Sequence, residues 1–240
     1  MFLSPAKNWV DNNGKKTETF DVTAHIGDFS HQSASFDHDD GMLMDHGFDF
    51  YAPQTFEDEN GRRILFGWMG KPDEFEPLQP TIEQGWIHQM TCPRELTLFN
   101  NKLRQQPSQE LMAMRRNERR FRGLSTAFEG LSAELQLNGL DGKTLTIEVA
   151  DDLKIEISSS GLNTTRRNLK TKQWESIEWK GKVRSLQLLR DASSLEVFIN
   201  EGEGVSTSRF FGQGFGVQSA CGFAVQSEQE ISATHWTLEA

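Results

Sequence analysis

The sequence is poor in the residues that stabilise a chain without a large apolar core. Its 240 residues include only two cysteines, Cys92 and Cys221, and neither has a second Cys or a His at metal-ligand spacing. We therefore expect no disulfide framework and no zinc site, and we interpret both cysteines as free thiols. Proline (7 residues) and glycine (20 residues) are at ordinary levels, which excludes collagen-like and low-complexity chains.

Long apolar runs and an excess of basic charge are also absent. The longest strongly apolar stretch, Ile64–Met69, is far shorter than the roughly 20 residues that a membrane-spanning helix needs. No basic segment followed by an apolar block opens the chain, so we expect a cytoplasmic protein with no membrane partner. The net charge of -10 argues against nucleic acid as a partner, because an acidic surface repels a polyanion.

The acidic charge is concentrated in the first part of the chain. Residues 1–107 contain 9 Lys and Arg against 17 Asp and Glu, whereas residues 108–240 contain 16 against 18. The segment Phe29–Glu59 has no Lys or Arg at all. Its simplest interpretation is an acidic face in contact with water. The difference in charge indicates two differently built regions.

Alternating apolar and polar residues indicate that the chain is mostly β. Clear period-two patterns surround Ile147, Ile155 and Val197, as expected for half-buried antiparallel strands. Hairpin-type turn sequences lie between such runs, at Asp11–Gly14, Asp58–Gly61, Asn100-Asn101, Asp141-Gly142 and Asn200–Gly202. The short, regular strands downstream are typical of a sandwich.

One segment has a helical pattern. Ser108 is a possible N-cap behind Pro107, and Leu111 and Met114 follow at helical spacing. We therefore predict a linker helix over 108–119, between an aromatic-rich domain at 1–107 and a β-sandwich at 120–240.

Four blocks follow one another along the sequence. They are the aromatic strands Asp49–Phe56 and Arg62–Gly70, the closing stretch Gly85-Trp86 with Thr91–Leu98 and Leu103–Pro107, the strand Leu195–Gly202, and Ser206–Phe211. In this order the blocks resemble glycoside hydrolase family 32, the family of bacterial sucrose and sucrose-6-phosphate hydrolases (β-fructofuranosidases). The resemblance implies an all-β fold, with the end of a five-bladed β-propeller (a remnant of the fourth blade and the fifth blade) followed by a C-terminal β-sandwich.

The resemblance covers the C-terminal half of the family only. The family's catalytic carboxylates come from three motifs in earlier blades, Asn-Asp-Pro-Asn-Gly for the nucleophile, Arg-Asp-Pro for a transition-state stabiliser and Glu-Cys for the acid/base. None of the three occurs in this sequence. Phe2–Pro5 is similar to the strand just after the Glu-Cys motif, so we expect that the chain holds no catalytic residue and that it is inactive alone.

Three residues are candidates for contact with a fructosyl substrate. Asp49 interrupts an aromatic run, and the resemblance places its segment near the fructosyl site. Its carboxylate could instead accept backbone or Arg hydrogen bonds and fix the strand. Tyr51 could donate to a sugar hydroxyl or could be a buried tyrosine with its hydroxyl satisfied. Trp68 could stack on a sugar face or pack between blades.

Other candidate groups support no further site. The six histidines, His25, His31, His38, His46, His88 and His235, show no pairing along the sequence that suggests a metal site. Glu95 is best explained by an ion pair with its neighbour Arg94 at a strand end. No metal and no cofactor are therefore expected.

The resemblance implies retaining hydrolysis of a β-fructofuranosyl bond in sucrose or its 6-phosphate by the parent enzyme. The expected partners are a fructosyl saccharide and either a chain that carries the missing blades or a second copy. A different class of function also fits the sequence, namely a non-catalytic carbohydrate-binding or subunit-interaction module. Trp174, Trp179 and Trp236 lie in or near strands of the sandwich and could face in either direction.

Overall fold

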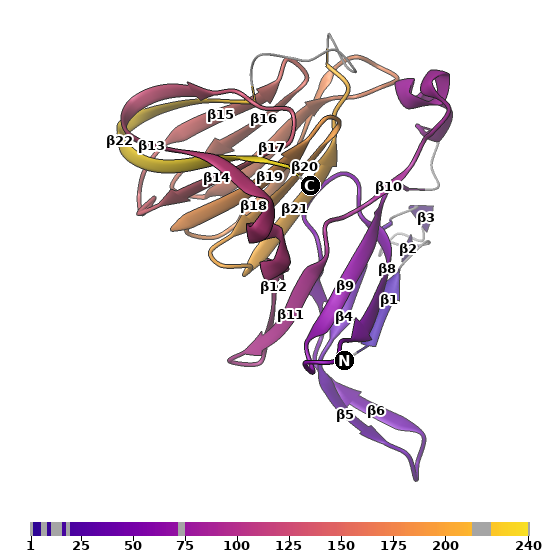
Figure 1. Cartoon of the computed structure of the whole chain (residues 1–240). Coiled ribbons are helices and arrows are strands. Elements are labelled where there is room, and N and C mark those ends of the chain that lie inside the picture. Colours follow the sequence, from indigo (N-terminus) through magenta and orange to yellow (C-terminus); the bar gives the residue numbers. More distant parts are fainter. Residues whose placement is uncertain are drawn as a thin grey trace.

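The protein is an all-β molecule with two regions that pack against each other (Figure 1). We refer to residues 2–107 as the N-terminal region and to residues 115–239 as the sandwich. None of the described helices is long and apolar enough to cross a membrane. The computed structural model describes residues 2–5, 9–10, 16–17, 20–71, 75–212 and 222–239.

The N-terminal region has a five-stranded antiparallel sheet at its centre. Its strand β9 carries β8 on one edge, while β10 and β11 pair with successive halves of its other edge. The sheet is therefore four strands wide, in the order β8, β9, β10 with β11, and β12, which is the width of a propeller blade. The strands are β8 (Tyr51–Glu57), β9 (Arg63–Met69), β10 (Gln89–Met90), β11 (Arg94–Phe99) and β12 (Lys102–Pro107).

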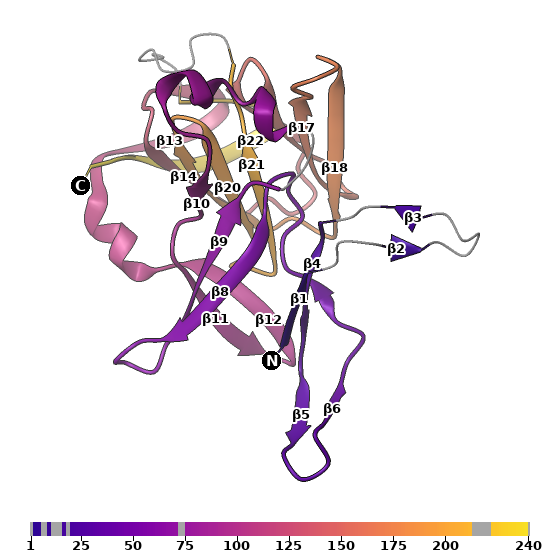
Figure 2. The ribbon, with the colours of Figure 1, turned by 90° about the vertical axis from the view of Figure 1, so that its right-hand side faces the viewer.

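Beside this blade-like sheet lie a three-stranded sheet, two hairpins and two short helices. The three-stranded sheet has the order β1-β4-β7, and the β2–β3 and β5–β6 hairpins extend away from the rest of the protein (Figure 2). The elements are β1 (Phe2–Pro5), β2 (Trp9–Val10), β3 (Lys16–Thr17), β4 (Val22–His25), β5 (Gly27–Ser30), β6 (Ser35–His38), β7 (Met42–Leu43), η1 (Glu76–Leu78) and η2 (Pro80–Gln84).

The sandwich is one continuous sheet that folds into two layers. The long strand β22 pairs with β15 through Ala224–Ser227 and with β14 through Ser232–Thr237, so its two halves lie in different layers. β13 follows β22 around the same bend (Figure 1). The strands are β13 (Arg115–Phe128), β14 (Ala133–Asn138), β15 (Leu145–Ala150), β16 (Leu153–Ile157), β17 (Gly161–Arg167), β18 (Trp174–Lys180), β19 (Ser185–Asp191), β20 (Ser194–Ile199), β21 (Gly204–Arg209) and β22 (Phe223–Leu238).

The apolar core of the sandwich lies between these two layers. Ile147 and Ile155 from one layer and Val197 from the other are fully buried in the same cluster. The period-two patterns predicted these inward positions correctly, because alternate side chains of a strand face the same side of its sheet.

Three predicted hairpin turns are confirmed, and a fourth turn has a different role. The turns at Asp58–Gly61, Asn100-Asn101 and Asn200–Gly202 join the antiparallel pairs β8–β9, β11–β12 and β20–β21. Asp141-Gly142 instead lies between β14 and β15, which belong to different layers and do not pair. The fifth predicted turn, Asp11–Gly14, lies outside the described residues.

The predicted linker helix over 108–119 is wrong in length and type. A 3₁₀ helix, η3 (Gln109–Met114), is followed directly by strand β13, and Asn117 has a positive φ of 51° that no helix tolerates. Ser108 does not cap the backbone with its side chain, since its hydroxyl donates to the Glu110 carboxylate. Pairing of β13 with β22 outweighs the local helical pattern. This pairing is a tertiary effect, so the local sequence does not predict it.

Candidate functional site

Asp49 lies just before β8 and connects the N-terminal region to the sandwich. Its carboxylate accepts a hydrogen bond from the Arg166 side chain of β17 at 2.5 Å and another from the backbone N–H of Arg209 at 2.7 Å. The Asp49 backbone N–H donates to the Thr207 carbonyl oxygen at 3.0 Å. The contacts that the sequence offered as the alternative to sugar binding are therefore present.

Tyr51 and Trp68 lie opposite each other on β8 and β9. They are partners in the strand register, and their ring centroids are 6.2 Å apart at an interplanar angle of 62°. The edge of the Phe20 ring meets Tyr51 at 5.6 Å. These three half-buried rings form an aromatic wall on one face of the blade-like sheet, and Asp49 points away from it toward the sandwich.

The polar edge of Trp68 is packed against Gly70 and His88. The Trp68 and His88 rings meet edge to face at 4.8 Å, and a Cβ at position 70 would lie 2.5 Å from Trp68 Nε1. Within the part of the chain that the structure describes, Trp68 Nε1 and His88 Nδ1 are buried without a hydrogen-bond partner. A buried N–H without a partner is uncommon. The Trp68 indole N–H is therefore available to donate a hydrogen bond to an additional acceptor.

A buried arginine, Arg94 of β11, holds the two regions together. Its side chain has 0% exposure and donates to Glu196 of β20 at 2.7 and 2.9 Å and to Asp45 at 3.1 Å. It also donates to Thr207 Oγ1 at 2.6 Å and to Gln105 Oε1 at 3.1 Å. Burial by itself lowers the pKa of Arg94, but the carboxylates of Glu196 and Asp45 outweigh burial and raise it. Arg94 is therefore a permanent cation between two anions.

Arg209 of β21 is the second buried arginine at this interface. Its guanidinium lies over the rings of Trp86 and Phe211, at 5.4 and 4.9 Å from their centroids, and donates to the Ser193 carbonyl oxygen. Burial lowers its pKa to about 10, although Asp49 opposes this effect. Since the backbone of the same residue donates to Asp49, the position of Asp49 depends on how β21 is packed.

The acidic segment of the sequence is only partly a solvated face. Asp37, Asp39 and Asp40 are exposed as expected, but Asp45 is 7% exposed and Asp49 is shielded by Arg166. Sequence reasoning missed this inward pairing, and also Arg94, Glu196 and Arg209. The sequence feature that could have identified such residues is a charged residue within a strand of otherwise apolar or uncharged residues, as at Leu195-Glu196-Val197.

The expected ion pair between Arg94 and Glu95 does not form. Arg94 pairs with Glu196 and Asp45, while Glu95 lies 3.8 Å from Arg62. Neighbouring residues of a strand point to opposite faces, so adjacency in sequence does not bring them together. Cys92 is a free thiol as predicted, and burial raises its pKa. Cys221 lies outside the described residues.

These contacts define what the site can do chemically. Asp45, Asp49 and Glu196 each accept hydrogen bonds from arginine side chains and act as fixed structural anions. The aromatic wall offers apolar surface and a few polar edges, which are the features that recognise a sugar ring.

The sequence matches two family descriptions along its length. Glycosyl hydrolases family 32 N-terminal domain matches residues 3–107, and Glycosyl hydrolases family 32 C terminal matches residues 110–237. The sucrose-6-phosphate hydrolase of Salmonella typhimurium is 42% identical over 80% of this chain and 41% of its own length. The sucrose-6-phosphate hydrolase of Bacillus subtilis is 36% identical over 89% of this chain and 46% of its own length.

Solved structures have the same fold. The sucrose-6-phosphate hydrolase from Lactobacillus gasseri superposes with a TM-score of 0.75 at 21% identity, covering 99% of this chain and 55% of that chain. The Bombyx mori GH32 beta-fructofuranosidase BmSUC1 superposes with a TM-score of 0.71 at 25% identity, covering 91% of this chain and 47% of that chain.

The protein spans less than half the length of the two curated relatives, 41% and 46%. The blade-like sheet matches the family's N-terminal domain and the sandwich its C-terminal domain, with a sequence identity well above the level at which only the fold is shared. The chain therefore belongs to glycosyl hydrolase family 32.

Proposed function

We propose that this chain is the C-terminal portion of a β-fructofuranosidase that hydrolyses sucrose or sucrose-6-phosphate with retention of configuration. Both domain matches and the relatives named sucrose-6-phosphate hydrolase support this assignment. The main observation behind this proposal is that the blade-like sheet and the sandwich are both present, whereas the three motifs that hold the catalytic carboxylates are absent from the sequence.

On this proposal the chain alone is inactive. A retaining glycosidase places two carboxyl groups about 5–5.5 Å apart, one to attack the anomeric carbon and one to protonate the leaving oxygen. The carboxylates of Glu196 and Asp49 accept hydrogen bonds from Arg94 and Arg166, so they are held as structural anions and are not free to attack an anomeric carbon.

The retained residues then bind and orient the sugar. In the complete enzyme, β8 is the first strand of the last of five blades, so the Tyr51–Trp68 wall borders the central channel where a propeller holds its site. We assign Tyr51 and Trp68 to contact with the fructosyl ring. Asp49 fixes the start of β8 through Arg166 and Arg209.

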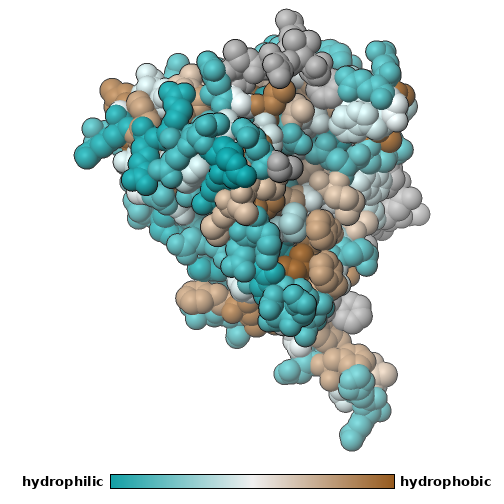
Figure 3. Space-filling model, viewed as in Figure 1, coloured by the Kyte–Doolittle hydropathy of each residue, from teal (hydrophilic) through white to brown (hydrophobic). Residues whose placement is uncertain are grey.

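The proposal also implies a partner for the exposed apolar face of the blade-like sheet. Phe56 is 50% exposed and is stacked on Phe66, with 6.4 Å between ring centroids, on the face that also carries Tyr51 and Trp68. Apolar side chains gather over the N-terminal region in Figure 3, whereas the sandwich is mostly hydrophilic in this view. Large apolar patches are rarely left exposed to water, and in a propeller the neighbouring blade covers this face. On this proposal the segment that covers the patch is the one that carries the catalytic motifs.

Complementation tests this proposal. The purified chain is assayed for fructose release from sucrose and sucrose-6-phosphate, alone and after mixing with the N-terminal portion of the Salmonella typhimurium relative. We expect no turnover by the chain alone and turnover by the mixture, with β-fructofuranose as the first product. Turnover by the chain alone that survives repurification and disappears in Asp49→Asn would overturn the proposal, as would a mixture that neither associates nor hydrolyses either sugar.

A non-catalytic carbohydrate-binding module is the second candidate. Trp174 is 45% exposed and Arg167 lies over its ring at 4.6 Å, so the sandwich offers one exposed aromatic surface. A homodimer that binds fructans, loses affinity in Trp174→Ala and does not associate with the catalytic segment would favour this module over the split enzyme.

The proposed substrate also suggests a location. A phosphorylated sugar is charged and does not cross a membrane freely, so the cell that phosphorylates it retains it. If the 6-phosphate is the substrate, the enzyme acts in the cytoplasm.

A further inference from the structure

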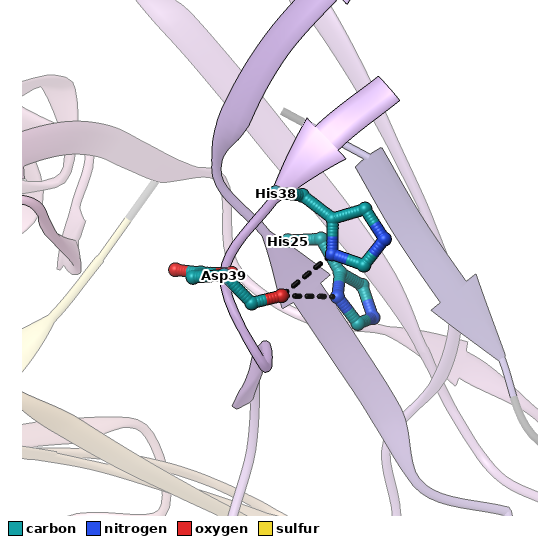
Figure 4. Close-up of side chains that lie close together, drawn as sticks. All are labelled: His25, His38 and Asp39. Atoms are coloured by element: carbon teal, nitrogen blue, oxygen red, sulfur yellow. Dashed lines mark hydrogen bonds between the residues drawn. The ribbon is translucent and has the colours of Figure 1, made fainter. Parts of the chain in front are cut away.

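Two histidines and an aspartate converge where the β5–β6 hairpin joins the N-terminal region (Figure 4). One ligand atom from each of His25, His38 and Asp39 can be chosen so that all lie within 4.8 Å of one another. We propose that these three residues bind one divalent transition-metal cation of the Zn²⁺ type. The sucrose-hydrolase assignment does not enter this inference.

The strand register brings the three residues to one face. Gly27 of β5 is opposite His38 of β6, and His25 precedes Gly27 by two residues, so both histidines lie on the same side of the ladder. The ladder continues through Asp39, whose N–H donates to the Ile26 carbonyl oxygen at 3.0 Å. This pairing has no signal in the sequence, because twelve residues separate the two histidines and only the strand register relates them.

Asp39 is held in place by the backbone on both sides. Its Oδ1 accepts hydrogen bonds from Ile26 N–H at 3.1 Å and from Gly41 N–H at 3.0 Å. Gly41 has a φ of 83°, and a Cβ at this position would lie 2.5 Å from the His25 ring. The turn therefore requires glycine in order to bring Asp39 and His25 together.

Both imidazole rings direct Nδ1 toward the carbonyl oxygen of Asp39, as Figure 4 shows. The distances to this oxygen are 2.6 Å for His38 and 3.5 Å for His25. On the far side of the His25 ring, Nε2 lies 3.1 Å from Thr23 Oγ1, which can accept its proton. Because the Asp39 carbonyl oxygen can only accept, each Nδ1 carries the proton in these contacts, and a bound cation displaces it. The His25 ring then takes the tautomer with its proton on Nε2, where the hydrogen bond to Thr23 is the outer contact typical of a metal-binding histidine.

The His38 ring is also fixed in orientation. It stacks on Phe36 with 4.9 Å between centroids and meets the His25 ring edge to face at 4.9 Å. Two oriented imidazoles and oxygen ligands favour Zn²⁺, Ni²⁺ or Cu²⁺ over Mg²⁺ or Ca²⁺, which prefer all-oxygen sites. The exposed carboxylates of Asp28 and Asp37 on the same hairpin add negative charge that attracts a cation.

Calorimetric titration of the tag-free chain with ZnCl₂ tests the proposal. We expect one equivalent of Zn²⁺ to bind, and at least tenfold weaker binding in His25→Gln, His38→Gln and Asp39→Asn. His31→Gln is the matched control, because His31 lies on the same hairpin with its ring against Phe29 and outside the site. This control should bind Zn²⁺ as the original chain does, and millimolar Mg²⁺ should not compete.

A second measurement separates loss of binding from loss of structure. The absorption of bound Co²⁺ reports its ligands directly and should lose its imidazole contribution stepwise in the two histidine variants, while circular dichroism stays unchanged. Binding without defined stoichiometry, equal weakening by His31→Gln, or displacement by Mg²⁺ would overturn the site. If the original chain binds no Zn²⁺ and His38→Gln unfolds the β5–β6 hairpin, the two imidazole rings serve only as hydrogen-bond donors. The proposal is then wrong.

Discussion

The two regions of this protein bury their apolar residues very differently. Among the described residues, the main cluster of the sandwich has 23 buried apolar residues between its layers, whereas the main cluster of the N-terminal region has 7. Among the described residues, eight of the eleven large apolar side chains that are exposed belong to the N-terminal region. The sandwich covers its own apolar faces, and the blade-like sheet leaves part of its surface for neighbours.

The contact between the regions combines charged groups with a small apolar cluster, in which Leu189, Phe198 and Val205 of the sandwich pack against Cys92. Its central groups are charged, with Arg94 between Asp45 and Glu196, and Asp49 against Arg166. Buried ion pairs contribute less net stability than apolar packing of the same volume, but breaking one of them leaves a charge without a partner. The interface is therefore sensitive to the loss of a single charged group, because the partner of that group then stays buried without its counter-charge.

Limited proteolysis would show the largest difference between the regions. We expect cleavage first within residues 1–107, and a resistant fragment that contains the sandwich, because local opening is easiest where few apolar contacts must be lost. Mass spectrometry of the fragments over time measures this directly. Early cleavage of the sandwich with an intact N-terminal region would show that the blade is stabilised in some other way.

Replacing the buried arginine tests the interface. Arg94→Leu leaves Asp45 and Glu196 as buried anions without their cation, so we expect a loss of about 3–5 kcal/mol in the free energy of unfolding. Urea denaturation followed by tryptophan fluorescence measures the change. The matched control is Arg63→Leu, whose ion pair with Glu57 is exposed and should contribute at most about 1 kcal/mol. A similar small effect for both variants would mean that the two regions are held together by other contacts.

Asp49→Ala separates the two interpretations of this residue. The substitution removes the acceptor for the Arg166 side chain and for the Arg209 N–H, so we expect a loss of about 2 kcal/mol in stability. Asp37→Ala, on the exposed hairpin, is the control and should change little. An Asp49→Ala chain with unchanged stability, which nevertheless lowers sugar affinity when complemented, would return Asp49 to direct contact with substrate.

Local patterns predicted much of the fold. The alternation around Ile147, Ile155 and Val197 identified strands and their buried faces, and turn sequences rich in Asn, Asp and Gly identified three hairpins. The prediction was wrong at β13, where pairing with a strand more than a hundred residues away decides the conformation. The bend of one sheet into two layers has no local signal for the same reason.

The candidate site was predicted only in part. Tyr51 and Trp68 were separate candidates, and the hairpin turn predicted between their strands is the feature that brings them together. Arg94 and Glu196 are 102 residues apart and meet only because the two regions dock. Such pairs cannot be derived from one sequence, because nothing in the spacing of either residue specifies its partner. Contact of Tyr51 or Trp68 with a sugar stays a prediction.

The sandwich core contains one polar side chain whose removal should stabilise the protein. His235 of β22 is 1% exposed and stacks on Phe128, with 4.8 Å between ring centroids. Among the described residues, neither of its ring nitrogens has a hydrogen-bond partner. Burial, with a smaller contribution from the charge of Arg119, lowers its pKa to about 4. The folded protein therefore holds this histidine neutral.

The lowered pKa makes the effect of His235 depend on pH. Between pH 6.5 and about 4 the unfolded chain binds a proton that the folded chain excludes, so stability is lost as the pH falls through this window and is fully present above it. His235→Phe removes both the unpaired nitrogens and this proton. We expect a gain of about 1 kcal/mol at pH 8, or roughly 2–4 °C in Tm, with about 2 kcal/mol more at pH 5. His31→Phe, on the exposed hairpin, should show neither effect. Thermal unfolding at the two pH values measures the difference, and a gain that is the same at both would show that His235 titrates normally inside the core.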